Sequence, residues 1–60
     1  MRGYFVVKFT DNFGFEHAVH VWAYSNYHAI SLVEEWFSYP MTVTEVYLDW
    51  DLRSPAFIIS

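Results

Sequence analysis

The sequence contains no cysteine, so neither a disulfide nor a thiolate metal site can stabilise this chain. It is also poor in positive charge, because only Arg2, Lys8 and Arg53 stand against seven carboxylates and the net charge is −4. Proteins bind nucleic acid largely by neutralising phosphates with Lys and Arg, so this acidic composition argues against a nucleic-acid partner. It is compatible with a basic protein partner.

Long apolar runs are missing as well, and none comes near the roughly 20 residues that a membrane helix needs. Met1-Arg2-Gly3 leads directly into a strand pattern, without the apolar region of a signal peptide. With only Gly3 and Gly14, the chain has no glycine-rich phosphate loop. We therefore expect a cytoplasmic protein that does not associate with a membrane.

Aromatic residues, in contrast, are abundant, with six Phe, five Tyr and three Trp in a chain of 60 residues. A chain of this length forms one domain, residues 1–60, with a small core. Each ring can bury about 150–250 Å², which is more than such a core can easily hide. We expect some rings at the surface or in a subunit interface, and a homodimer would supply burial that the monomer lacks.

The first half of the chain predicts a β-hairpin. Residues 4–10 and 15–24 are rich in β-branched and aromatic residues, and Asp11-Asn12-Phe13-Gly14 between them has turn chemistry. If Asp11 pairs with Phe15, then every second residue of both strands falls on one nearly continuous apolar face. The turn and the alternation therefore predict the same register.

The second half predicts a helix and a third strand. Ser25 is a suitable N-cap for a helix over 26–38, with an apolar arc that includes Ala29, Val33 and Trp36. The proline at position 40 ends this helix. Residues 42–52 alternate between apolar and charged or aromatic side chains as a strand does, with Val46, Leu48, Trp50 and Leu52 as the set expected to face the helix, and 54–60 form an apolar tail.

These elements predict an α+β fold of the ββαβ type, a three-stranded antiparallel sheet in the order 2-1-3 with one helix packed on one face. The first strand is apolar on both sides, which suits a central position. The third strand carries charges that protect an exposed edge. The tail either covers part of the remaining sheet face or adds a fourth strand.

One short helix covers only one face of such a sheet, so the other face is expected to be bare. An aromatic patch with a polar rim is typical of a protein-binding surface. We predict that the partner-binding residues on this face are Tyr4, His20, Trp22, Tyr24, Tyr47 and Asp49.

The candidates for catalysis and metal binding are weak. His17 and His20 are three residues apart on a strand, so their rings are expected to point to opposite faces and cannot share a metal ion. Asp49 and Asp51 fall on one face of the third strand, where edge protection explains them better than acid–base chemistry. We therefore expect no enzymatic activity, no metal and no cofactor.

The layout of two strands running into Val21-Trp22-Ala23-Tyr24-Ser25 and then Ala29-Ile30-x-x-Val33 resembles a pattern common in very small phage-encoded proteins. This resemblance covers residues 4–50 and implies a ββαβ adaptor or inhibitor that acts by occlusion, in the host cytoplasm and on a host protein. The favoured function is thus a non-enzymatic protein-interaction module. The alternative is a small-molecule or nucleotide binder with a pocket at a homodimer interface.

Overall fold

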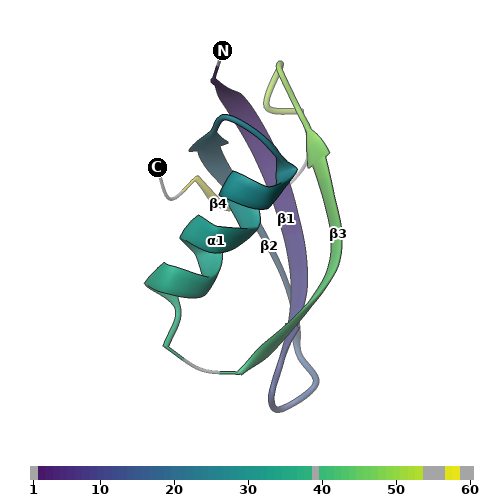
Figure 1. Cartoon of the computed structure of the whole chain (residues 1–60). Helices are drawn as coiled ribbons and strands as arrows, with labels where there is room; N and C mark the ends of the chain where they lie inside the picture. Colours follow the sequence, from purple (N-terminus) through teal and green to yellow (C-terminus); the bar gives the residue numbers. More distant parts are fainter. Residues whose placement is uncertain (1, 39, 54–56, 59–60) are drawn as a thin grey trace.

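The computed structural model describes residues 2–38 and 40–53 and the backbone of 57–58. Its elements are β1 (Gly3–Asp11), β2 (Glu16–Ala23), α1 (Asn26–Trp36), β3 (Met41–Leu48) and β4 (Phe57–Ile58). The strands form one sheet in the order β3-β1-β2-β4, and α1 lies across one of its faces (Figure 1). The predicted α+β fold, with the first three strands in the order 2-1-3 and one helix, is confirmed.

The β1–β2 hairpin has the predicted register, with Val7 opposite Val19 and Phe5 opposite Val21. The turn closes through two backbone hydrogen bonds: the Asp11 N–H donates to the Phe15 carbonyl at 2.9 Å, and the Gly14 N–H donates to the Asp11 carbonyl at 3.1 Å. Gly14 has a φ of 88°, a conformation that L side chains rarely adopt. Turn chemistry and strand alternation together therefore fix which side chains face the helix.

Strand β3 contains a β-bulge that the alternating pattern does not reveal. Lys8 is paired with Glu45, but the next residue of β1, Phe9, is paired with Val43, so Thr44 is an extra residue. The Thr44 hydroxyl donates a hydrogen bond to the Lys8 carbonyl at 3.2 Å. Because of the bulge, Val43 and Val46 both pack against the core although they are three residues apart.

The prediction that the third strand extends to residue 52 is wrong, since β3 ends at Leu48. Asp49 still donates its N–H to the Tyr4 carbonyl at 2.7 Å, and the chain then turns, with the Leu52 N–H donating to the Asp49 carbonyl at 3.3 Å. Leu52 takes a left-handed φ of 53° there. Residues 50–52 therefore form a turn and do not continue β3, because local hydrogen bonds within the turn replace the hydrogen bonds between β3 and β1.

The helix begins as predicted, because the Ser25 hydroxyl accepts a hydrogen bond from the His28 N–H at 3.1 Å. It ends at Trp36 instead of at residue 38, since Phe37 is already extended and its ring lies 5.4 Å from the ring of Phe9. A core contact thus shortens the helix. Trp36, which the apolar arc placed in the core, is 43% exposed.

The core lies between α1 and the sheet and uses the apolar face predicted for the hairpin. Its buried members share the helix side of β1 and β2 or the inner side of α1: Phe5, Val7, Phe9, Val19, Val21, Ala23, Ala29 and Val33. Phe5 and Val21 thus face the helix, as the register requires. The central position of β1 between β2 and β3 explains why both of its faces are apolar.

The predicted tail over 54–60 lies outside the described residues except for β4. There the backbone of Phe57 and Ile58 pairs in parallel with Val19 and His20 of β2, which makes β4 the fourth strand. Of the two alternatives for the tail, the structure thus contains the added strand. Among the described helices none has the length and apolar character required to cross a membrane.

Candidate functional site

The sheet face away from α1 carries Trp22, whose side chain is held in place by its cross-strand neighbour. Tyr4 lies directly opposite Trp22 in the β1–β2 ladder, and the two rings meet edge to face with centroids 4.8 Å apart. Such aromatic pairs stabilise one another beyond the area they bury. Trp22 nevertheless remains 37% exposed, so an ordered indole lies at the surface.

A buried polar pair lies beside these rings. His20 is only 1% exposed, and its Nε2 lies 2.9 Å from the Asp49 carboxylate. The ring of Tyr4 is edge-on to His20 at 6.4 Å. His20 Nδ1 has no hydrogen-bond partner among the described residues. The contacts therefore form a row from the half-buried Asp49 through the buried His20 and the half-buried Tyr4 to the exposed Trp22.

Tyr24 and Tyr47 make separate contacts on either side of this row. The Tyr24 ring stacks on His28 of α1 at 5.3 Å, and the Arg2 guanidinium lies 4.4 Å from its centroid. Tyr24 also donates its backbone N–H to His28 Nδ1 at 2.9 Å, so the end of β2 is tied to the first turn of α1. Tyr47 is half-buried, and the Lys8 ammonium lies 5.8 Å from its ring.

The structure thus brings four of the six predicted residues together in one row, namely Tyr4, His20, Trp22 and Asp49. The prediction that this face is bare is wrong for its centre. Val6 and His20 are buried, and Tyr4, Tyr47 and Asp49 are partly so. Only Trp22 and Tyr24 of the predicted set are exposed, because the other members shield one another and β4 extends the sheet beside His20. His20 and Asp49 therefore support the surface residues and do not lie on the surface themselves.

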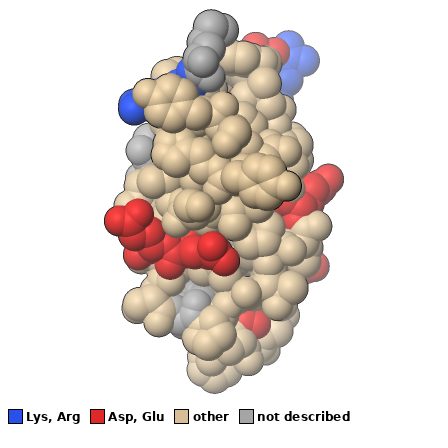
Figure 2. All heavy atoms as spheres, viewed as in Figure 1, with Lys and Arg blue, Asp and Glu red and all other residues tan. Residues whose placement is uncertain are grey.

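The three cationic side chains all have partners within the chain. Lys8 pairs with Glu45 at 3.3 Å and Arg53 with Asp51 at 3.4 Å, while Arg2 lies over Tyr24. Figure 2 shows the helix side of the molecule as mostly uncharged surface, with a band of acidic groups over the C-terminal half of α1. Among the described residues, the three glutamates without an ion pair are Glu16, Glu34 and Glu35. The unneutralised charge is therefore negative.

At the other end of the hairpin, Asp11 organises the turn. One carboxylate oxygen accepts the N–H groups of Phe13 at 2.8 Å and Phe15 at 3.0 Å, and the other lies 2.8 Å from His17 Nε2. The hydrogen bond from His17 is the main reason that the pKa of Asp11 is lowered from its ordinary value of 3.8, and the two backbone N–H groups act in the same direction. His17 in turn stacks on Phe9 of the core at 5.0 Å.

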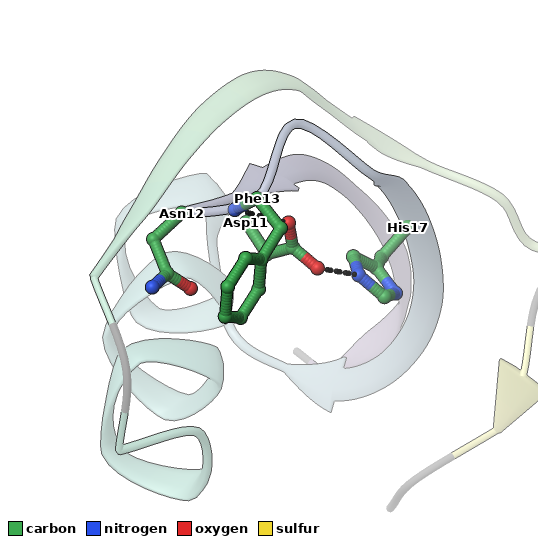
Figure 3. Close-up of a pocket in the computed structure, with 4 residues that line it drawn as sticks. All are labelled: Asp11, Asn12, Phe13 and His17. Atoms are coloured by element: carbon green, nitrogen blue, oxygen red, sulfur yellow. Dashed lines mark hydrogen bonds and ion pairs between the residues drawn. The ribbon is translucent and has the colours of Figure 1, made fainter.

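This turn presents two phenylalanines to solvent, Phe13 at 79% and Phe15 at 69% exposure. Figure 3 shows the Asp11 carboxylate directed toward His17, with the Phe13 ring beside it and the Asn12 amide on the far side. The four side chains line an open, shallow hollow of about 350 Å³. The sequence pattern predicts no functional site in this turn. The available signal was an apolar residue at the centre of a turn, where polar residues and glycine are usual.

In the part of the chain that the structure describes, the His and Asp side chains do not converge on a shared metal site. His17 and His20 point to opposite faces of the sheet, as predicted, and each already pairs with a different aspartate. The two aspartates expected on one strand face are separated, since Asp51 lies in the turn after β3 and pairs with Arg53. No group of three or more His, Asp or Glu side chains within the described ranges could hold a metal ion.

Sequence and structure comparisons do not relate this chain to a known protein. No protein-family model matches it, and no curated protein and no solved structure matches it significantly. The geometry of its own side chains is therefore the basis for the function that we propose.

Proposed function

We propose that this protein is a non-enzymatic protein-interaction module that binds a partner protein through Trp22 and the adjoining Tyr24. The observation that carries the proposal is the state of Trp22, which is 37% exposed and yet fixed by the edge-to-face contact with Tyr4. Trp and Tyr are the residues most enriched in interface hot spots, and an indole ordered in advance loses little entropy on binding.

The buried pair beside Tyr4 supports this proposal. Because the hydrogen-bonded pair of His20 and Asp49 lies beside the ring of Tyr4, with the two rings edge to face, the Tyr4 ring is supported by packed side chains. A binding residue gains affinity when its neighbours hold it in the productive orientation. Here those neighbours lie on the regular strands of the hairpin and not on a loop.

The charge distribution supports a basic partner. The net charge is −4 and the three cations are engaged within the chain, so the field of the molecule attracts positive charge. A small rigid domain of this kind can cover a partner's working surface, and inhibition by occlusion, of the kind implied by the resemblance to small phage-encoded proteins, is the mode of action that we propose. A homodimer would present two such surfaces.

Two tryptophan variants test the proposal. Trp22→Ala removes the proposed anchor, whereas Trp36→Ala removes an indole of similar exposure from the end of α1. The wild type and each variant are immobilised and used to capture proteins from a cell lysate. The binding of the captured protein is then titrated with purified components. We expect Trp22→Ala to lose the partner while retaining most of its stability, and Trp36→Ala to bind like the wild type.

Trp22→Phe distinguishes loss of the partner contact from loss of folding, because a phenyl ring can keep the edge-to-face contact with Tyr4. Equal binding by the wild type and Trp22→Ala would contradict the proposal, provided that circular dichroism shows both to be folded.

A thermal-shift panel of nucleotides tests the alternative function, a small-molecule or nucleotide binder. A rise of several degrees in the melting temperature with one nucleotide would favour a small-molecule binder, since a ligand specific for the native state stabilises it.

A further inference from the structure

The hairpin turn displays apolar surface that the fold itself does not need. Phe13 and Phe15 are 79% and 69% exposed, the highest values among the phenylalanines in the described part of the chain. The turn is held by Gly14 and by the hydrogen bonds of Asp11, and none of these depends on a phenyl ring at position 13 or 15. Side chains that contribute so little to the fold suggest a role in contact with another molecule.

The turn is also well ordered for its position at the tip of a hairpin. Both backbone N–H groups of the two phenylalanines are bound by Asp11, and the same carboxylate is linked through His17 to Phe9 in the core. The rings are therefore carried by a backbone that is already fixed. Binding then costs little loop ordering, which is a major part of the entropy lost in most loop-mediated contacts.

We propose that the hairpin tip inserts Phe13 and Phe15 into an apolar cleft of a partner protein whose rim is basic. The size of the tip favours a cleft. Each ring can bury about 150–250 Å². Two rings thus fall well short of the roughly 800 Å² per partner found in a standard interface. A flat contact between the tips of two copies would be too small, whereas a recess encloses the rings from several sides.

Charge at the tip favours a protein over a lipid surface. Asp11 is ionised at neutral pH, which lies well above the ordinary pKa of 3.8, and the exposed Glu16 follows the turn. The sequence contains no Lys or Arg between Lys8 and Arg53, and Lys8 is already paired with Glu45. Anionic membrane surfaces attract clusters of cations and repel such a tip. A rim of Lys or Arg around an apolar recess complements it.

This site is independent of the Trp22 surface. Trp22 pairs with Tyr4 near the start of β1, whereas the turn joins the end of β1 to the start of β2. The two contact points therefore lie at opposite ends of the hairpin. A protein with both can join two partners or two parts of one partner.

The experiment uses the full chain with a photo-reactive benzoylphenylalanine in place of Phe13 or Phe15. The matched control carries the same group in place of Ser31, which is exposed on α1. After crosslinking in cells, the adduct is identified and its protein is purified. Binding is then titrated with the wild type, with the double variant Phe13→Ser/Phe15→Ser and with Asn12→Ser, at two salt concentrations.

We expect one protein to crosslink at both phenylalanine positions but not at Ser31. The double variant should bind it about 30-fold more weakly or worse, as for other hot-spot truncations. Asn12→Ser should bind it like the wild type, and higher salt should slow association. Because the rings bury little, the melting temperature of the double variant should stay close to that of the wild type.

Three results would overturn the proposal. The first is the absence of an adduct above the Ser31 control, or an adduct whose protein binds the double variant with unchanged affinity. The second is co-sedimentation of the wild type, but not of the double variant, with phosphatidylcholine or phosphatidylserine vesicles, which would assign the tip to a membrane. The third is a change in oligomeric mass caused by the double variant alone, which would assign the tip to a second copy of this chain.

Discussion

His20 Nε2 lies 2.9 Å from the Asp49 carboxylate, although β1 lies between β2, which carries His20, and β3, which ends just before Asp49. This contact joins residues that are far apart in the sequence and ties the end of β3 to the middle of β2. It lies on the face opposite α1, so the sheet is held together from both sides.

Loss of this contact should destabilise the protein measurably. Asp49→Ala leaves the Nε2 of a buried imidazole without its partner, and we expect the free energy of unfolding to fall by about 1–3 kcal/mol. Asp51→Ala is the control, because the side chain of Asp51 is 67% exposed and its pairing with Arg53 should contribute less than about 1 kcal/mol. Urea unfolding measures both values. Equal effects of the two substitutions would contradict the structural role of the pair.

The carboxylate of Asp11 should make the stability depend on pH in the acid range. Its pKa in the folded protein is lowered, chiefly by the hydrogen bond from His17, so the unfolded chain binds the proton more tightly. The stabilisation is therefore complete above the ordinary pKa of 3.8 and is lost as the pH falls through the lowered folded value. The melting temperatures of the wild type and Asp11→Asn should differ near pH 6 and converge toward pH 2. A difference that stays constant over this range would show that ionisation of Asp11 is not involved.

Substitution by alanine should change the stability of the protein differently at its two glycines. Gly14 has a φ of 88°, and a Cβ there would meet no atom within 4 Å, so Gly14→Ala should cost about 1–2 kcal/mol through backbone strain alone. At Gly3 a Cβ would lie 2.8 Å from Leu48 Cδ1, the end of a side chain that is 40% exposed and able to move. We expect Gly3→Ala to cost less than Gly14→Ala and to change the fluorescence of Trp50, whose ring lies beside the same position. The opposite order of stabilities in urea would contradict this explanation.

The start of α1 depends on Ser25. Replacing it by alanine removes the acceptor of the His28 N–H and should lower the free energy of unfolding by about 0.5–2 kcal/mol. Ser31→Ala is a matched change on the exposed side of the same helix, and it should raise stability by a few tenths of a kcal/mol, roughly the difference in helix propensity. Thermal unfolding followed by circular dichroism compares the two. If Ser31→Ala destabilises as much as Ser25→Ala, the cap is not the cause.

The hairpin and the order of the first three strands could be predicted because several local signals agree. The turn at 11–14 and the two-residue alternation give one register, and Phe5, Val6 and Val7, apolar on both faces, indicate that β1 has a neighbouring strand on each edge. Agreement of this kind was absent in the third strand. Thr44 is an ordinary strand residue, so nothing local indicates that it is the extra residue of a bulge.

The burial of His20 could not be predicted either, and the reason differs from that for the bulge. It depends on the contact with Asp49 and on the pairing of β4 with β2, both of which join segments far apart in the chain. From its position on the strand, His20 belonged to the open face together with Trp22. Strand alternation predicts the face of His20, whereas the exposure of each side chain depends on neighbours that a single strand does not specify. The exposure of Phe13 and Phe15 does not follow from the sequence, because turn chemistry at residues 11–14 does not specify where neighbouring apolar side chains point.

The bulge in β3 also affects what happens at high concentration. β3 lies at the outer edge of the sheet, and an uninterrupted row of free backbone donors and acceptors there would be a template for the growth of fibrils. The extra residue at Thr44 breaks the spacing of that row, and the neighbouring ion pair of Glu45 with Lys8 places charged groups beside this edge. Both features disfavour the pairing of identical strands along this edge, which favours specific contacts of the exposed rings over the stacking of sheets.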